Sequence, residues 1–176
     1  MQKLSMDQLN RVDIESFKEL EKVPVTIVLD NVRSMHNVGS AFRTADGFAI
    51  EQIILCGITA TPPHREIEKT ALGATQSVQW SHYKETATAI QELKAQGYKV
   101  LAIEQAEGSV SLEKFEITAN QKYALVFGNE VHGVDEEVMS MVDGCIEIPQ
   151  FGTKHSFNVS VTIGIILWDL LKKIKF

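Results

Sequence analysis

The sequence predicts an α/β protein with a mostly parallel sheet that is flanked by helices on both faces. Short apolar runs alternate with helical patterns along the chain, which is the usual order of elements in such folds. The runs are almost continuously apolar, as in residues 25–29, and this is typical of strands that are buried on both faces. The chain has 176 residues and contains no linker or internal repeat, so we expect one domain over residues 1–176.

The elements follow in order from apolar periodicity and from the residues that stop helices. Ser5 and Gln8 have the spacing of a capping box before a rough apolar stripe, which indicates an N-terminal helix that ends before Pro24. Gly47, Gly73 and Gly97 each follow a helical pattern, as expected of helix ends. Helices are expected over residues 5–21, 38–46, 65–72, 85–96, 134–141 and 157–173, and strands over residues 25–29, 52–56, 77–80, 99–103, 123–127 and 145–148.

Composition and charge exclude several classes of protein. The net charge is −6, with 17 Lys and Arg against 23 Asp and Glu, so the surface cannot be uniformly basic, although a local basic groove remains compatible with it. The two cysteines form no CxxC pair and the five histidines lack metal-ligand spacing, so we expect neither a disulfide framework nor a metal site. The first residues contain no apolar segment of a secretory signal, and no apolar run reaches membrane-spanning length. We therefore expect a cytoplasmic protein without a membrane segment.

Three segments that follow strands carry the unusual residues: 30–43, 128–135 and 149–158. In parallel sheets the ligand lies where the strands end, so these segments are the candidate site. None of them contains a dinucleotide fingerprint, a Walker motif or a nucleophile elbow. In the first segment, Gly39 would let the backbone approach an anion at a helix start, and Arg43 would aim its donors at a phosphate. A helix cap and a surface arginine explain the same pattern.

The other two segments combine turn residues with polar side chains. Glu130 places a carboxylate in a tight turn between Gly128 and Gly133, where an ordinary turn residue would also fit. Ser156 is a candidate N-cap of the last helix. Asn158 is then expected in the first turn among apolar neighbours, where a buried amide needs hydrogen-bond partners.

Taken together, the motifs N-x-G-x-x-x-R, F-G-N-E-x-x-G and I-P-x-x-G-x-x-x-S-x-N-V-S-V closely resemble those of the SpoU/TrmH family of RNA ribose 2′-O-methyltransferases, in the SPOUT superfamily. The resemblance runs from about residue 25 to the end of the chain. It implies a deep C-terminal trefoil knot over roughly residues 124–165, an S-adenosylmethionine pocket formed by the knot, and a homodimer with the active site at its interface. Gln150 and Phe157 stand where many relatives have Met and Leu.

The resemblance also implies the residues of the site. Arg43 is a proposed base in the family, but a guanidinium stays protonated, and we therefore expect it to orient and stabilise a phosphate. The implied catalytic residues are Asn37, Arg43, Glu130, Ser156 and Asn158, and the implied cofactor contacts are Phe127, Gly128, Asn129, Ile148, Pro149, Phe157 and Asn158.

The expected substrate is a structured RNA, with tRNA as the first expectation and ribosomal RNA as the second. Basic residues near the three segments would hold the RNA in a narrow groove, and we expect Arg33, Arg43, Arg65 and Lys154 among them. Two alternatives use the same fold: a methyltransferase that acts on a base, and a non-catalytic RNA-binding module.

Overall fold

Seven parallel strands form the sheet of this computed structural model, which describes residues 2–5, 8 and 12–175. The strands are β1 (Val23–Asp30), β2 (Ile50–Cys56), β3 (Gln79–Tyr83), β4 (Tyr98–Ile103), β5 (Val110–Ser111), β6 (Lys122–Phe127) and β7 (Gly144–Glu147). They lie in the order β3-β2-β1-β6-β4-β7-β5, and every pair is parallel. The predicted fold class is confirmed.

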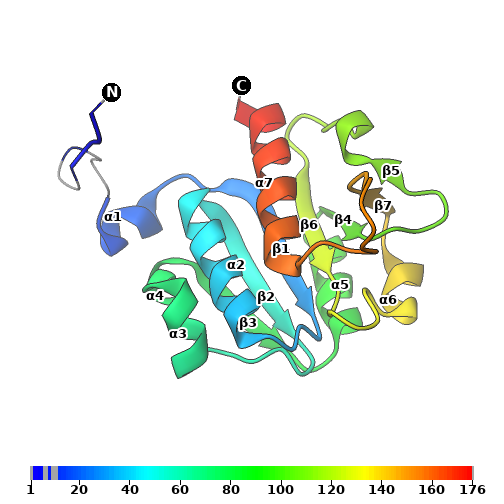
Figure 1. Cartoon of the computed structure of the whole chain (residues 1–176), viewed down its shortest axis with the longest axis horizontal. Coiled ribbons are helices and arrows are strands. Elements are labelled where there is room, and N and C mark those ends of the chain that lie inside the picture. Colours follow the sequence, from blue (N-terminus) through cyan, green and yellow to red (C-terminus); the bar gives the residue numbers. More distant parts are fainter. Residues whose placement is uncertain (1, 6–7, 9–11, 176) are drawn as a thin grey trace.

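Helices cover both faces of this sheet, because its central strands are apolar on both sides. Ile27 and Leu29 of β1 belong to one core cluster, which also contains Phe42 and Leu167, whereas Val28 belongs to a second cluster with Ile90. The first face carries α1 (Ile14–Glu19), α2 (Met35–Gly47), α3 (Arg65–Ala71), α4 (Ala74–Ser77) and α7 (Val159–Lys175), and the second carries α5 (Thr86–Ala95) and α6 (Glu136–Met141). α2 and α7 lie side by side in front of the sheet (Figure 1).

Several helices begin at residues other than those predicted, because side-chain caps set where they start. Within the expected helix over 5–21 the structure has α1, which Asp13 caps, and residues 6–7 and 9–11 lie outside the described part of the chain. α2 begins three residues earlier than expected because Ser34 caps it, and α6 begins at Glu136 because Asp135 caps it. The strand expected over 77–80 was wrong in its first half, since Ser77 ends α4 and β3 starts at Gln79.

Gly39 has a different role from the expected one. It lies in the second turn of α2, and a Cβ there would stand 2.2 Å from the carbonyl oxygen of Ile67 and from Oγ1 of Thr70. Thr70 Oγ1 also donates a hydrogen bond of 2.9 Å to the carbonyl of His36. The missing side chain therefore lets α3 pack closely on α2, and the expectation that Gly39 brings backbone close to an anion is wrong.

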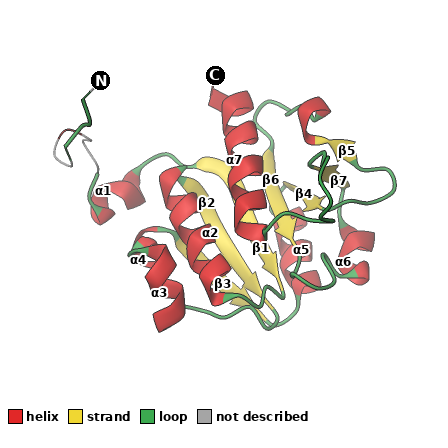
Figure 2. Cartoon of the chain, viewed as in Figure 1, coloured by secondary structure: helices red, strands yellow, loops and turns green. Residues whose placement is uncertain are grey.

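The carboxyl ends of the strands share one edge of the sheet, because all strands run in the same direction. The loops that leave β1, β6 and β7 there are drawn green in Figure 2. The loop after β7 runs back to α7, which packs against α2. Strand order alone does not define how the chain is threaded, so the trefoil knot stays a prediction.

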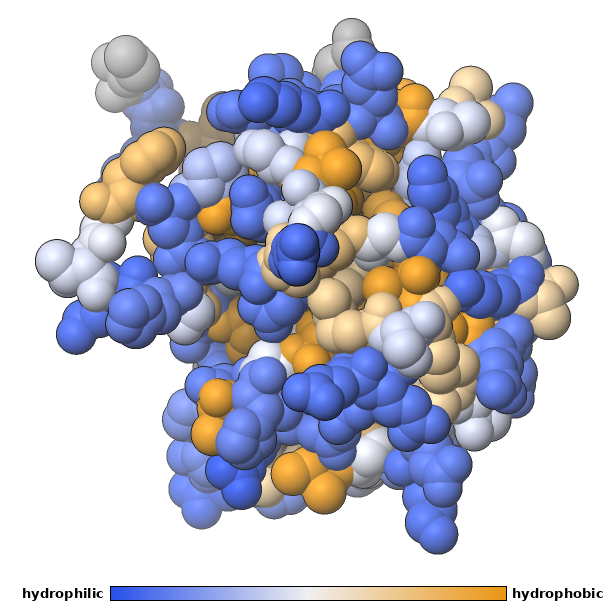
Figure 3. Space-filling model, turned by 90° about the vertical axis from the view of Figure 1, so that its right-hand side faces the viewer, coloured by the Kyte–Doolittle hydropathy of each residue, from blue (hydrophilic) through white to orange (hydrophobic). Residues whose placement is uncertain are grey.

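The side of the molecule that carries β5 and β7 shows apolar side chains bordered and interrupted by hydrophilic ones (Figure 3). Within the described residues, no helix combines the length and the apolar character that crossing a bilayer requires.

Candidate functional site

A cleft of about 660 Å³ opens where β4, β6 and β7 end. Such a volume suits a ligand of the size of a nucleoside. Its walls combine apolar side chains such as Phe127 with polar ones, and three carboxylates lie among them, from Glu104, Glu130 and Glu147. Of the residues expected to contact a cofactor, Phe127, Gly128, Asn129, Ile148, Phe157 and Asn158 line the cleft, whereas Pro149 does not.

A tight turn after β6 forms one wall of the cleft. Asn129 and Gly133 exchange two backbone hydrogen bonds of 3.0 Å, and the Asn129 side chain accepts from the N–H groups of Val131 and His132 at 3.0 and 2.9 Å. Gly128 precedes the turn, and a Cβ there would stand 1.9 Å from the backbone carbon of Gly133. The turn therefore closes only because residue 128 has no side chain.

The Glu130 carboxylate binds the N-terminal end of α2. It accepts hydrogen bonds of 3.2 Å from the backbone N–H groups of Arg33 and Ser34, and one of 3.0 Å from the amide of Asn37. Partial burial raises the pKa of Glu130, but these donors together with its own backbone N–H outweigh that effect and hold the pKa below its ordinary value. The anion at this helix start is thus a carboxylate of the chain itself.

Asn37, in the first motif, forms hydrogen bonds with a residue of each of the other two motifs. Its amide nitrogen donates to Glu130, and its amide oxygen accepts a hydrogen bond of 3.2 Å from the Asn158 amide. The oxygen of Asn158 accepts from the backbone and the hydroxyl of Ser160 at 2.9 and 2.6 Å. The expectation that Asn158 is buried in the first turn is wrong: it is exposed and caps α7, a role that the sequence had suggested for Ser156.

Glu104 is a cleft residue that sequence reasoning missed. It follows β4, lines the cleft, and accepts hydrogen bonds from the N–H groups of Gln105 and Val134 at 2.9 and 3.2 Å. A Cβ on Gly133 would stand 2.1 Å from its Oε2. Its position directly after a predicted strand is the signal that would have identified it.

The remaining predicted residues are divided between the cleft and the surface. Ser156 lines the cleft, whereas Arg43 lies on the exposed side of α2 and does not. Within the part of the chain that is described, no hydrogen bond or ion pair engages the Arg43 side chain. The three other expected RNA contacts, Arg33, Arg65 and Lys154, are exposed.

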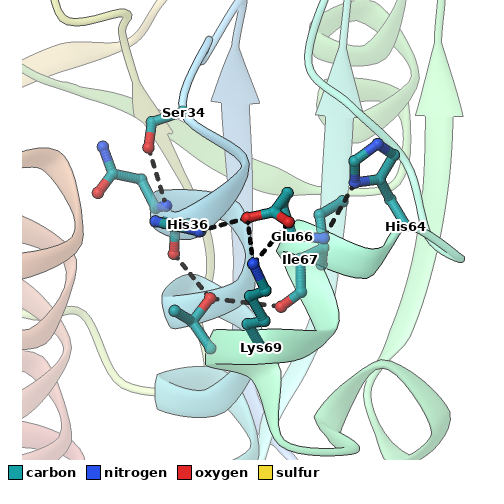
Figure 4. Close-up of polar contacts among 8 residues, drawn as sticks. Ser34, His36, His64, Glu66, Ile67 and Lys69 are labelled. Atoms are coloured by element: carbon teal, nitrogen blue, oxygen red, sulfur yellow. Dashed lines mark hydrogen bonds and ion pairs between the residues drawn. The ribbon is translucent and has the colours of Figure 1, made fainter.

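A polar cluster on α3 lies beside the start of α2 (Figure 4). Glu66 accepts from Lys69 at 2.7 Å and contacts His36 Nε2 at 3.0 Å, and these two partners lower the pKa of Glu66. His64 caps α3 by accepting from the Glu66 backbone N–H at 3.2 Å. Lys69 is thus already paired with a carboxylate, while the neighbouring Arg65 is exposed. Among the residues described, no group of three His, Cys, Asp or Glu side chains has a metal-binding arrangement.

Two curated proteins and one solved structure are similar to this chain. The tRNA (guanosine(18)-2′-O)-methyltransferase of Borreliella burgdorferi is 29% identical over 92% of this chain and 72% of that protein. The 23S rRNA (guanosine-2′-O-)-methyltransferase RlmB of Neisseria meningitidis serogroup B is 29% identical over 90% of this chain and 62% of that protein. The AdoMet-bound rRNA methyltransferase from Sinorhizobium meliloti has a TM-score of 0.80 and 27% identity, and the match covers 89% of this chain and 59% of that one.

The sequence pattern of the SpoU rRNA Methylase family matches residues 24–168. That range contains the three motifs and every residue that lines the cleft. The chain belongs to the SpoU rRNA Methylase family.

Proposed function

We propose that the protein is an S-adenosylmethionine-dependent methyltransferase that modifies the ribose 2′-OH of a nucleotide in structured RNA. The observation that carries the proposal is the hydrogen-bonded connection of Glu130, Asn37 and Asn158, which unites the three motifs at the mouth of one cleft. Family membership and the activities of the similar proteins support it. Because these RNAs are found there, the proposal places the protein in the cytoplasm.

The cleft suits S-adenosylmethionine in size and in chemistry. Phe127, Ile148 and Phe157 offer apolar surface for a flat adenine, and the backbone at Gly128 lies where β6 ends. Glu104, Glu130 and Glu147 place negative charge in a cleft that would receive a sulfonium and an ammonium group. Bound there, the cofactor would supply a methyl group already activated by the positive sulfur.

The chain's own task is to align a weak nucleophile and to help remove its proton. We assign Arg43 to hold the phosphate beside the reacting ribose, because its guanidinium stays charged and presents a fork of donors. Asn158 and Ser156 would orient the hydroxyl at the cleft. Glu130 already accepts three hydrogen bonds with a lowered pKa, so we assign it to position the site rather than to take the proton. The RNA phosphate or water would then accept that proton.

A homodimer would explain why Arg43 lies outside the cleft of its own chain. Val161 and Trp168 on α7 are 49% and 56% exposed, and with the half-buried Ile165 they form an apolar stripe next to α2. A twofold interface over this stripe and α2 would bury it and bring the Arg43 of each protomer to the interface.

Light scattering is expected to give a mass near twice the 19.6 kDa of one chain at micromolar concentration. Trp168→Glu should shift the protein toward the monomer, because it puts a charge on the apolar stripe that the dimer would bury. A wild-type mass near that of one chain would contradict the dimer.

The substrate is expected to be tRNA first and ribosomal RNA second, held by Arg33, Arg65 and Lys154 beside the site. Arg65→Ala and Lys154→Ala should each weaken RNA binding and lower the slope of log affinity against log salt by about one. Lys18→Ala on α1 is the matched control and should leave the slope unchanged. An RNA affinity that does not depend on salt would contradict this assignment.

The function is tested by methyl transfer. Purified protein is incubated with methyl-labelled S-adenosylmethionine and with separate tRNA and rRNA fractions from cells that lack the protein. We expect label in one fraction only. Binding of RNA without any transfer would identify a non-catalytic module instead.

A further inference from the structure

The loop between β7 and α7 carries an aromatic side chain that almost no other atom covers. Phe151 is 95% exposed, the highest value among the large hydrophobic side chains that the structure describes. Its neighbour Gln150 lines the cleft, but Phe151 does not, so the ring stands outside the cofactor pocket and next to it. A large apolar side chain in this position usually indicates a contact surface.

Hydrogen bonds hold the loop at the end that leads into α7, where Asn158 donates to the side-chain oxygen of Asn37 at 3.2 Å. The Gln105 side chain, directly after β4, donates a hydrogen bond of 3.0 Å to the carbonyl of His155. Gly152 has no atom within 4 Å of an added Cβ, so the tip of the loop lies in open space. These two hydrogen bonds fix the end of the loop next to α7, whereas residues 151–154 are exposed.

Basic groups accompany the ring. Lys154 and His155 are exposed on the same loop, and neither forms an ion pair with any residue in the described ranges. An aromatic ring beside donors for phosphate is the chemistry that binds unpaired nucleotides, since every base offers a face for stacking. Although the chain as a whole is acidic, Lys154 has no carboxylate partner among the described residues and is therefore available to an anionic partner.

We propose that residues 151–155 form a stacking arm for the RNA substrate. An unpaired base of the RNA stacks on Phe151, and Lys154 and His155 hold the adjoining phosphates. The arm keeps the strand open beside the cleft, where a ribose must be splayed out to react. This inference rests on the proposed function and names the feature of the RNA that this site recognises.

Phe151→Ala, Phe151→Tyr and wild type are compared in the full-length protein with S-adenosylhomocysteine present. Leu20→Ala, at the opposite end of the sheet and 43% exposed, is the matched control. The probes are a fluorescent 12-nucleotide oligoadenylate and an abasic oligomer of the same length. Phe151→Ala should weaken oligoadenylate binding by between about 5-fold and about 100-fold and leave abasic binding unchanged, while Phe151→Tyr should bind like the wild type.

Three results would overturn the arm: no loss in Phe151→Ala, an equal loss for both oligomers, or a loss of S-adenosylhomocysteine affinity or dimer mass. The last would assign the ring to the cleft or to a second copy of the chain. Methyl transfer by the wild type is measured separately. A protein that methylates RNA but binds both oligomers equally refutes only the arm, and one that prefers oligoadenylate but transfers no methyl group refutes only the function.

Discussion

Arg43→Ala is expected to slow methyl transfer to RNA by at least about 100-fold, as when one preorganised donor is removed from a catalytic site. Cofactor affinity should stay within a few-fold of the wild type, because Arg43 does not line the cleft. The fold should also be unaffected, since Arg43 is exposed and none of the described residues pairs with its side chain. Single-turnover methyl transfer and calorimetry with S-adenosylmethionine measure the two quantities separately.

Arg43→Lys distinguishes charge from geometry. A lysine keeps the positive charge but not the planar fork, so we expect it to recover only part of the lost rate. Arg65→Ala is the matched control, because it should weaken RNA binding while leaving the rate at saturating RNA intact. An Arg43→Ala protein that methylates RNA at the wild-type rate would show that the role assigned to Arg43 is wrong.

Gly128→Ala is expected to damage both stability and cofactor binding. Its Cβ would stand 1.9–2.2 Å from backbone atoms of Gly133 and Val134, so the turn that carries Asn129 and Glu130 must move. Overpacking of this kind costs about 1–3 kcal/mol of unfolding free energy. A shift of about 1 Å in the cleft wall should reduce methyl transfer on the order of 100-fold.

Gly47→Ala provides the control for this variant. No atom lies within 4 Å of a Cβ at Gly47, which ends α2, so alanine should be neutral or slightly stabilising there. Urea unfolding and titration calorimetry should therefore separate the two glycine variants clearly. Equal stability and equal cofactor affinity in Gly128→Ala and wild type would contradict the structure of the turn.

The sheet was predictable because its central strands are almost continuous apolar runs. The cores of β1, β2, β4 and β6 were located within two residues, whereas α4 and the two-residue β5 were missed because neither has a pattern of sufficient length. Ser34 was a readable cap for α2, since it precedes the helix directly and accepts from the Asn37 backbone N–H.

The candidate site was predictable only where motifs marked it. Glu130, Asn37 and Asn158 lie far apart in the sequence, and the structure joins them by hydrogen bonds; their roles stay predictions. Glu104 and Gln105 carry no motif, and their contacts with the loops after β6 and β7 depend on strand order, which apolar periodicity does not specify. Packing between distant segments also explains Gly39, whose partner is α3.

The chemical identity of the product tests the central claim most directly. RNA is incubated with the protein and methyl-deuterated S-adenosylmethionine, digested to nucleosides and analysed by mass spectrometry. The account predicts one nucleoside in which the deuterated methyl group resides on the ribose fragment and the free base is unlabelled. Label on the free base would contradict the account and indicate a base methyltransferase on the same fold.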